Sequence, residues 1–212
     1  MSEPHPDSST KDRILESAEE LFAQSGFDTV SVRDVTHKAG VNVAAVSYHF
    51  GSREGLIQAV LERAIRPVLA ERVRLLDAAE AKAGSKGPTI PVILDALIRP
   101  LVMQVRQSQV SQALFVKLAG RCLSDGLQQM PDGIKTAIRQ TVERFLDALH
   151  RALPNVAKGD LAWRLHFCHG VLMETLARDE ALRDLFPDLA TPMTTDVLLA
   201  TLINFCSAGM RQ

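Results

Sequence analysis

Residues 41–50 of this chain, VNVAAVSYHF, combine hydrogen-bonding and apolar groups at helical spacing. Five side chains fall on one face of the predicted helix: Asn42, Val43, Ala44, Ser47 and Tyr48. Val46 and Phe50 return to the opposite, apolar face. Amide, hydroxyl and phenol groups can hydrogen-bond to base edges or phosphates, and small apolar groups can contact thymine methyls. The pattern predicts a helix that packs on a hydrophobic core with one face and can contact a nucleic-acid groove with the other.

A second short helix precedes this one and is joined to it by a tight turn. Ser31 and Asp34 have the spacing of a capping box, so a helix is expected to start at Ser31 and to end at Gly40. Ala39 and Gly40 supply the small residues and the tolerant backbone of the turn. In a helix-turn-helix the second helix enters the major groove of DNA. The alternative interpretation is a helical hairpin that does not bind DNA.

The elements that must position this pair are helical too. An amphipathic helix is predicted over 10–25, with Thr10 as its cap and Gly26 as its stop. A long helix is predicted from Arg53, and Pro67 is expected to kink it or to end it one residue earlier. After a linker at 83–88, further helices are expected at about 89–107, 110–124, 133–152, 159–178 and 194–208.

Strand-like alternation persists nowhere, so the fold class is all-α. The predicted organisation is a disordered tail over 1–9, a small three-helix domain over 10–55 and a larger helical body over 56–212. The three cysteines are far apart and form no CxxC pair, which indicates a reduced, intracellular protein. No signal peptide or membrane-spanning run is present, so a cytoplasmic protein without a membrane partner is expected.

Charge restricts how the small domain could bind DNA. The whole chain has a formal net charge of -1. Its first 55 residues contain five Lys and Arg residues against nine Asp and Glu residues, which gives 5 - 9 = -4. A nucleic-acid interface in this domain therefore requires a local group of basic side chains, with the acids turned away from it.

Residues 11–60 resemble the TetR family of bacterial transcriptional repressors. The resemblance covers ILESAEELFAQSGFDTVSV at 14–32, the turn KAGV at 38–41 and the junction YHFGSREGLIQAV at 48–60. It implies a helix-turn-helix domain and a helical body that binds a small effector and dimerises. A dimer in turn implies a pseudo-palindromic DNA operator, whose half-sites lie about 34–36 Å apart or a multiple of that distance.

The resemblance carries over ten candidate DNA contacts: Thr29, Ser31, Arg33, Asn42, Val43, Ala44, Ser47, Tyr48, His49 and Arg53. Arg33 falls where the family contacts a base or a phosphate, and Arg53 stands in place of a phosphate-binding lysine. Tyr48 and His49 fall where aromatic and imidazole groups touch phosphates. Thr29 and Ser31, which precede the second helix, would contribute hydroxyl or backbone N–H contacts to phosphate.

The helix predicted over 41–50, which would read the DNA and is called the reading helix, departs from the family's pattern at Val43, Ala44 and Ala45. In the preceding helix, Thr36 stands where alanine is usual. An apolar reading helix offers few bidentate hydrogen bonds to bases. Base readout is therefore expected from Arg33, Asn42 and Ser47, with a share from DNA shape.

For the body, the resemblance implies that the last two long helices form the dimer interface. The candidate interface residues are Val171, Leu172, Thr175, Leu198, Leu202, Ile203 and Phe205, which ordinary core packing would explain equally well. Residues 161–177 resemble the branch that contains the fatty-acid-responsive pseudomonad repressor, which implies an apolar or amphipathic effector. The candidate ligand-binding residues are Arg99, Met103, Phe115, Leu118, Arg121, Cys122, Trp163, His166, Phe167 and Met173. Arg99, Arg121 or Arg164 would hold a carboxylate or phosphate head group.

Two other classes of site were considered. His166 and His169 have a spacing that can chelate a metal, but the chain offers no fixed acid or thiol beside them, so no metal or cofactor is expected. No Gly-rich phosphate loop, HExxH or GxSxG motif supports an enzyme. The remaining alternative is a helical adaptor that binds only protein.

Overall fold

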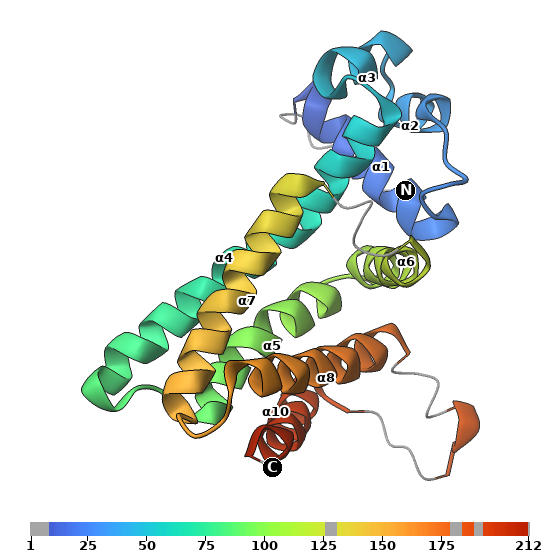
Figure 1. Cartoon of the computed structure of the whole chain (residues 1–212). Helices are drawn as coiled ribbons and strands as arrows, with labels where there is room; N and C mark the ends of the chain where they lie inside the picture. The colour runs from blue at the N-terminus through green and yellow to red at the C-terminus, as the bar shows by residue number, and fades with distance from the viewer. Residues whose placement is uncertain (1–8, 126–130, 179–183, 189–192, 212) are drawn as a thin grey trace. The chain divides into compact units, whose positions relative to one another are not determined.

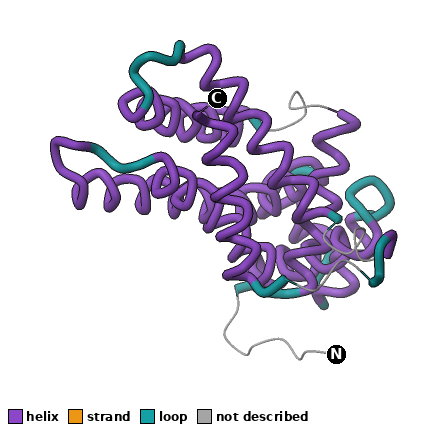
Figure 2. The backbone as a smooth tube through the Cα atoms, turned by 90° about the horizontal axis from the view of Figure 1, so that it is seen from below, coloured by secondary structure: helices purple, strands orange, loops and turns teal. Residues whose placement is uncertain are grey.

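A computed structural model describes residues 9–125, 131–178, 184–188 and 193–211, without the side chains of 118–125. Every regular element in these ranges is a helix, which confirms the predicted all-α class (Figures 1 and 2). The elements are α1 Thr10–Ser25, α2 Val32–Ala39, α3 Val43–Phe50, α4 Arg53–Ala83, a 3-10 turn Gly84–Lys86, α5 Ile90–Arg106, α6 Gln109–Asp125, α7 Asp132–Ala152, α8 Lys158–Ala177 and α10 Thr195–Arg211. None of the described helices has the length and apolar character needed to cross a bilayer.

The contacts divide the chain into two compact units. Unit 1 comprises residues 1–66 and 108–131, and unit 2 comprises residues 67–107 and 132–212. This division differs from the predicted boundary after residue 55, because α6 packs on α1 and belongs to unit 1. Apart from Ser9, the predicted tail lies outside the described residues.

Local signals set the ends of the helices. The cap of α1 is Ser9 rather than the predicted Thr10, because the Ser9 hydroxyl accepts a hydrogen bond from the Asp12 N–H at 3.2 Å. The sequence predicts that Pro67 kinks α4 or ends it one residue earlier. In the structure α4 continues through Pro67, so the second of these outcomes is wrong. A proline removes a single N–H donor, and Pro67 is exposed, so the carbonyl it leaves free can bind water.

The core of unit 2 forms where α5 packs against α7, α8 and α10. Ile93 and Leu94 of α5, Phe145 of α7 and Leu172 of α8 are among its fully buried side chains. On α8 the buried residues recur every three or four positions, so this helix contributes one apolar face to the shared interior: Leu161, Leu165, Cys168, Leu172 and Leu176.

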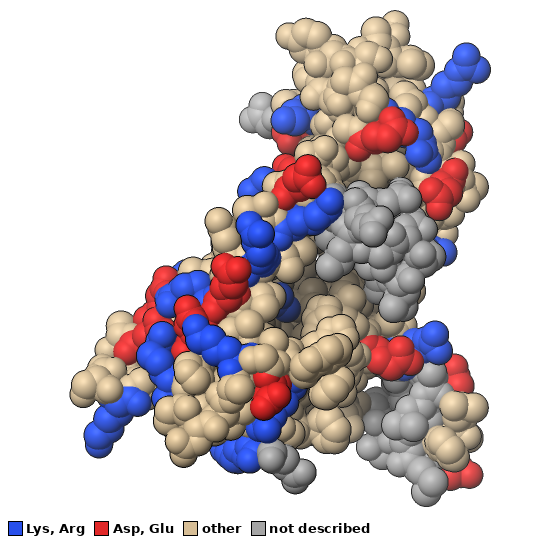
Figure 3. Space-filling model, in the orientation of Figure 1, with Lys and Arg blue, Asp and Glu red and all other residues tan. Residues whose placement is uncertain are grey.

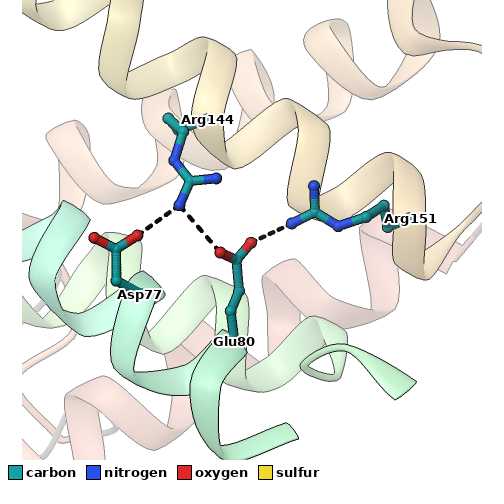
Figure 4. Close-up of polar contacts among 4 residues, drawn as sticks. All are labelled: Asp77, Glu80, Arg144 and Arg151. Atoms are coloured by element: carbon teal, nitrogen blue, oxygen red, sulfur yellow. Dashed lines mark hydrogen bonds and ion pairs between the residues drawn. The ribbon is translucent and has the colours of Figure 1, made fainter. Parts of the chain in front are cut away.

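An ion-pair network joins α4 to α7 within unit 2 (Figure 4). The Arg144 guanidinium donates to Asp77 at 2.5 Å and to Glu80 at 3.0 Å. Arg151 donates to the second carboxylate oxygen of Glu80. Glu80 is thus shared by two arginines, and networks of this kind stabilise more than isolated surface pairs do.

In unit 1, α3 and α4 meet at a very short junction. The Ser52 hydroxyl caps α4 by accepting from the Gly55 N–H at 3.1 Å. A Cβ atom added at Gly55 would lie 2.0 Å from the carbonyl oxygen of Phe50, the last residue of α3. Only glycine allows the end of α3 to approach the first turn of α4 this closely.

Replacing Glu80 with Gln should lower the free energy of unfolding of unit 2 by about 1 kcal/mol at low salt, because both arginines lose their shared anion. Urea unfolding followed by circular dichroism measures this loss, which should shrink as salt screens the pairs. Glu71→Gln is the control, because among the described residues Glu71 pairs with Arg74 of the same helix and with no second cation. An equal loss for both variants at all salt concentrations would contradict a role for the network.

Replacing Gly55 with Ala should lower the free energy of unfolding of unit 1 by about 1–3 kcal/mol, because the junction must open to admit the methyl group. Gly159→Ala is the matched control, since a Cβ at Gly159 meets nothing within 4 Å. That variant should be neutral or stabilised by up to about 1 kcal/mol. A Gly55→Ala protein with an unchanged unfolding midpoint would show that the junction is not tightly constrained.

Candidate nucleic-acid interface

The turn between α2 and α3 is held by backbone hydrogen bonds around one glycine. Gly40 has a left-handed conformation with φ 63°, and its N–H donates to the His37 carbonyl at 3.3 Å. The Val41 N–H donates to the Thr36 carbonyl at 3.0 Å and closes the turn. The left-handed backbone disfavours side chains with a Cβ, which explains why glycine stands there.

A capping box fixes the start of α2, as the sequence predicts. The Ser31 N–H donates to the Asp34 carboxylate at 2.8 Å, and the Asp34 N–H donates to the Ser31 hydroxyl at 3.2 Å. The Ser31 hydroxyl also donates to the same carboxylate at 2.6 Å. Ser31 therefore has its donors engaged inside the protein, whereas the neighbouring candidate Thr29 is exposed.

The reading helix α3 is held by one side and leaves the other open. Val46 of α3 and Val35 of α2 are buried and pack the two helices on the core of unit 1. The structure leaves all five residues of the outward face exposed: Asn42, Val43, Ala44, Ser47 and Tyr48. Tyr48 has 86% of its surface exposed. Asn42 caps α3 by accepting from the Ala44 N–H at 3.0 Å, so its amide NH2 group is the part left to donate to a base.

Arg53 binds the protein itself. Its Nε donates to the Val30 carbonyl at 3.2 Å, and an Nη donates to the Phe27 carbonyl. These bonds attach the start of α4 to the loop that precedes α2. The predicted phosphate contact of Arg53 is thus limited to the N–H groups that remain, and its main role in the structure is to hold that loop.

The three glutamates of α1 are paired with cations of unit 1. Glu20 pairs with Lys38 at 2.9 Å, and Arg63 lies 3.2 Å from Glu19 and 3.8 Å from Glu16. Burial raises the pKa of the Glu19 carboxyl above its ordinary value. The charge of Arg63 opposes this rise, and the neighbouring Glu16 and Glu20 add to it. These ion pairs place cations directly beside three of the acids, so the local field of those carboxylates is reduced although the net charge is the same.

The surface of α3 carries no Asp, Glu, Lys or Arg, and Figure 3 shows it as an almost uncharged cap. Arg33, at the start of α2, is exposed and forms no ion pair with a described residue. Such a free guanidinium beside a neutral helix suits contact with a base or a phosphate.

An aromatic group closes the end of α3. Tyr48 and His49 meet edge to face with ring centroids 4.9 Å apart, and His49 contacts Phe50 at 6.1 Å. The Lys11 ammonium lies 6.0 Å from the centre of the Phe50 ring. Sequence reasoning did not select Lys11, because nothing local in α1 indicates that this lysine lies beside the end of α3.

The residues predicted to bind a ligand are not gathered in one interior. Trp163 and Phe167 of α8 are 64% and 62% exposed, His166 and Met103 are exposed, and Met173 is half-buried. Phe115 lies in unit 1, and the side chains of Leu118, Arg121 and Cys122 lie outside the described residues. The prediction that Trp163 and Phe167 line an interior tunnel is corrected by their position, because Leu161, Leu165, Cys168, Leu172 and Leu176 form the buried face of α8.

The arginines chosen as head-group anchors are engaged by the protein. Arg99 binds Asp95 with two hydrogen bonds, at 3.0 and 2.6 Å. Arg164 donates to the Met210 carbonyl at 2.8 Å. Each therefore has a partner of its own, which weakens the prediction that it holds an effector.

The predicted interface residues divide by burial. Leu172, Leu198 and Leu202 are buried inside unit 2 and leave a partner little surface to contact. Val171, Thr175 and Ile203 are half-buried, and Phe205 is 64% exposed. A buried leucine is part of the protomer's core. The candidates that remain for the interface are therefore Val171, Thr175, Ile203 and Phe205.

Comparisons with known proteins agree with this geometry. A model described as "Bacterial regulatory proteins, tetR family" matches residues 14–60, and one described as "Tetracyclin repressor-like, C-terminal domain" matches residues 95–209. The chain is 52% identical over 50 residues to the probable HTH-type transcriptional regulator YttP of Bacillus subtilis, a match that spans 24% of each protein. It is 25% identical over 179 residues to the HTH-type transcriptional regulator UidR of Escherichia coli, which covers 76% of this chain and 89% of UidR.

The fold is also that of a solved regulator. The ketosteroid transcriptional regulator KstR2 of Mycobacterium tuberculosis superposes with a TM-score of 0.65 over 95% of each chain, at 16% identity. This similarity shows the fold, and the family matches and the relatives confirm the interpretation as a transcriptional regulator in preference to an enzyme. The chain belongs to the TetR family of DNA-binding transcriptional regulators.

Proposed function

We propose that the protein acts as a homodimer that binds a pseudo-palindromic operator in the cytoplasm and represses transcription until a small effector releases it. The observation that carries this proposal is the exposed, uncharged face of α3, together with the exposed Arg33 of the neighbouring helix α2, which forms no ion pair with a described residue. An exposed helix of this kind, held by a helix-turn-helix core, fits the major groove.

The contacts divide between bases and phosphates. Arg33, the Asn42 amide and Ser47 supply donors that can read base edges, while Val43 and Ala44 suit thymine methyls. Tyr48, His49 and Thr29 are placed for phosphate contacts, and Lys11 joins them because it lies beside the end of α3. With so few cations, the interface depends on each of them.

Exposed apolar surface supports the dimer. α8 presents Trp163 and Phe167, and α10, which packs on α8, presents Val197 and Phe205. Large aromatic side chains are enriched at protein interfaces and rare on the free surface of monomers. We therefore assign Trp163 and Phe167 to the dimer interface rather than to the effector site.

The effector is proposed to be apolar or amphipathic, as in a fatty acid or an acyl-CoA, and to act through α4. This helix begins at the Gly55 junction with α3 and, in its second half, carries Asp77 and Glu80, which bind α7. Displacing α4 would change the separation of the two reading helices in a dimer. Because both helices must meet grooves one turn apart, a small displacement costs specific affinity.

Operator binding can be tested after an operator is selected from a random duplex library with the wild-type protein. Affinity measured by fluorescence anisotropy should fall steeply as salt rises. Arg33→Ala and Asn42→Ser, which keeps an oxygen cap on α3, should lower the preference for operator over random DNA by about 5- to 100-fold. Tyr48→Ala should weaken binding to both DNAs equally.

Lys82→Ala is the control in that experiment, because it removes an exposed cation from α4 outside the interface. It should leave both affinities unchanged. Equal losses on operator and random DNA for Arg33→Ala and Asn42→Ser would reject the assignment of base readout. No duplex binding by the wild-type protein would favour the protein-binding adaptor.

Dimerisation is tested by placing charge on the apolar surface. Phe205→Glu should make the protein a monomer at micromolar concentration, because a carboxylate cannot be buried unpaired at an interface. Sedimentation velocity measures the change, and circular dichroism checks that the fold is kept. Val92→Glu alters an exposed valine of α5 and should stay dimeric. A dimeric Phe205→Glu protein would place the interface elsewhere.

A further inference from the structure

Arg72 occupies an unusual position on α4. Val68, Leu69 and Leu76 lie four residues before it, three before it and four after it, and all three are buried. Helical spacing places these positions on one face, so Arg72 stands in the middle of the apolar face of α4 within unit 2. Arginine is found there rarely unless its charge has a partner.

The partner that Arg72 has is neutral. Its Nε donates to the Leu97 carbonyl of α5 at 2.7 Å. No carboxylate among the described residues forms an ion pair with it, in contrast to Arg74, Arg99 and Arg144. Burial lowers the pKa of the Arg72 guanidinium to about 10. Arg72 is half-buried, so its guanidinium is partly removed from water while its Nη donors have no carboxylate partner among the described residues, an arrangement that costs stability.

A histidine lies close to this cation. Burial lowers the pKa of His169, on α8, and the charges of Arg72 and His166 lower it further. His169 is nevertheless exposed, so its imidazole can be reached from solvent. Its helical neighbours Leu165 and Leu172 are buried. Three helices of unit 2 thus bring polar groups together against apolar side chains.

We propose that Arg72 is the anchor for the carboxylate of an amphipathic effector, with His169 beside it and the surrounding apolar side chains contacting the effector's hydrocarbon part. This inference rests on the proposed function, in which an effector releases the protein from DNA, and it adds that the effector is an anion. The planar Nη groups can bind a carboxylate through two hydrogen bonds. Arg99 and Arg164 are less suited, because Asp95 and the Met210 carbonyl already occupy them.

A purely structural role for Arg72 leads to a different expectation. Pro100 of α5 has no N–H, so the Ala96 carbonyl lacks its helical donor, and Arg72 binds the carbonyl next to it. If Arg72 served only to support α5 there, Arg72→Met would lower the melting temperature. If Arg72 is kept for an anion, removing an unpaired, desolvated charge should leave the melting temperature of the ligand-free protein unchanged or higher.

The test uses titration calorimetry of the full chain, without DNA, with straight-chain alkanoates from hexanoate to hexadecanoate and the 1-alkanols of the same lengths. The tightest alkanoate should bind at least about 10-fold more tightly than its alkanol. Arg72→Met should weaken alkanoate binding by about 10- to 100-fold and leave alkanol binding unchanged. Arg74→Met, which removes an exposed arginine paired with Glu71, should bind alkanoates as the wild type does.

Three results would overturn the proposal: no alkanoate binds, acid and alcohol bind equally, or Arg72→Met binds the acid as tightly as the wild type. The last result together with a lower melting temperature would assign Arg72 to the support of α5. Operator affinity without ligand is measured in parallel and should be the same for Arg72→Met and the wild type. The wild-type protein could bind alkanoates through Arg72 and yet bind no operator. That result would reject the proposed repressor function but support Arg72 as the carboxylate anchor.

Discussion

The close approach of the Phe50 carbonyl to Gly55 is the constraint on which the reading helix depends. It leaves no room for a side chain between the end of α3 and the first turn of α4. Arg53, two residues earlier, binds the carbonyls of Phe27 and Val30 and so attaches the same turn to the loop before α2. The end of α3 is therefore tied to the first turn of α4, while α1 and α2 also pack against α3.

The interface combines a neutral reading helix with few cations. Lys38 and Arg63 bind acids of α1, which weakens the local field of those carboxylates but also occupies these two cations. Arg33 forms no ion pair within the part of the chain that the structure describes, and Lys11 of α1 lies beside the end of α3. Affinity for DNA would then come from a small number of well-placed groups, because the domain's overall field is not attractive to phosphate.

Unit 2 contains two features that ordinary core packing does not explain. Trp163, Phe167 and Phe205 expose aromatic surface to water, which is unfavourable for an isolated protomer. Arg72 has the opposite problem, since it is a charge placed among buried apolar side chains. Each feature costs stability in the isolated protomer, and under the two proposals the binding of a partner of matching chemistry would offset that cost.

The sequence was sufficient for the helix boundaries and for the family. Gly26, Gly40 and Gly51 end helices through local backbone conformation, and the Ser31–Asp34 box starts one, so a short stretch of residues carries the whole signal. The exceptions are local as well. Ser9 rather than Thr10 caps α1, and α4 continues through Pro67 because one lost hydrogen bond is tolerated at an exposed position.

The faces and partners of the side chains needed the packed chain. Residues 161–177 are apolar on several sides of α8, so periodicity alone could not tell that Leu165 and Leu172 are buried while Trp163 and Phe167 are exposed. Arg53 bonds to residues 23 and 26 positions away, and Arg72 to one 25 positions away. Such contacts form only when distant helices meet, because a charge on one helix has no local pattern that names its partner on another.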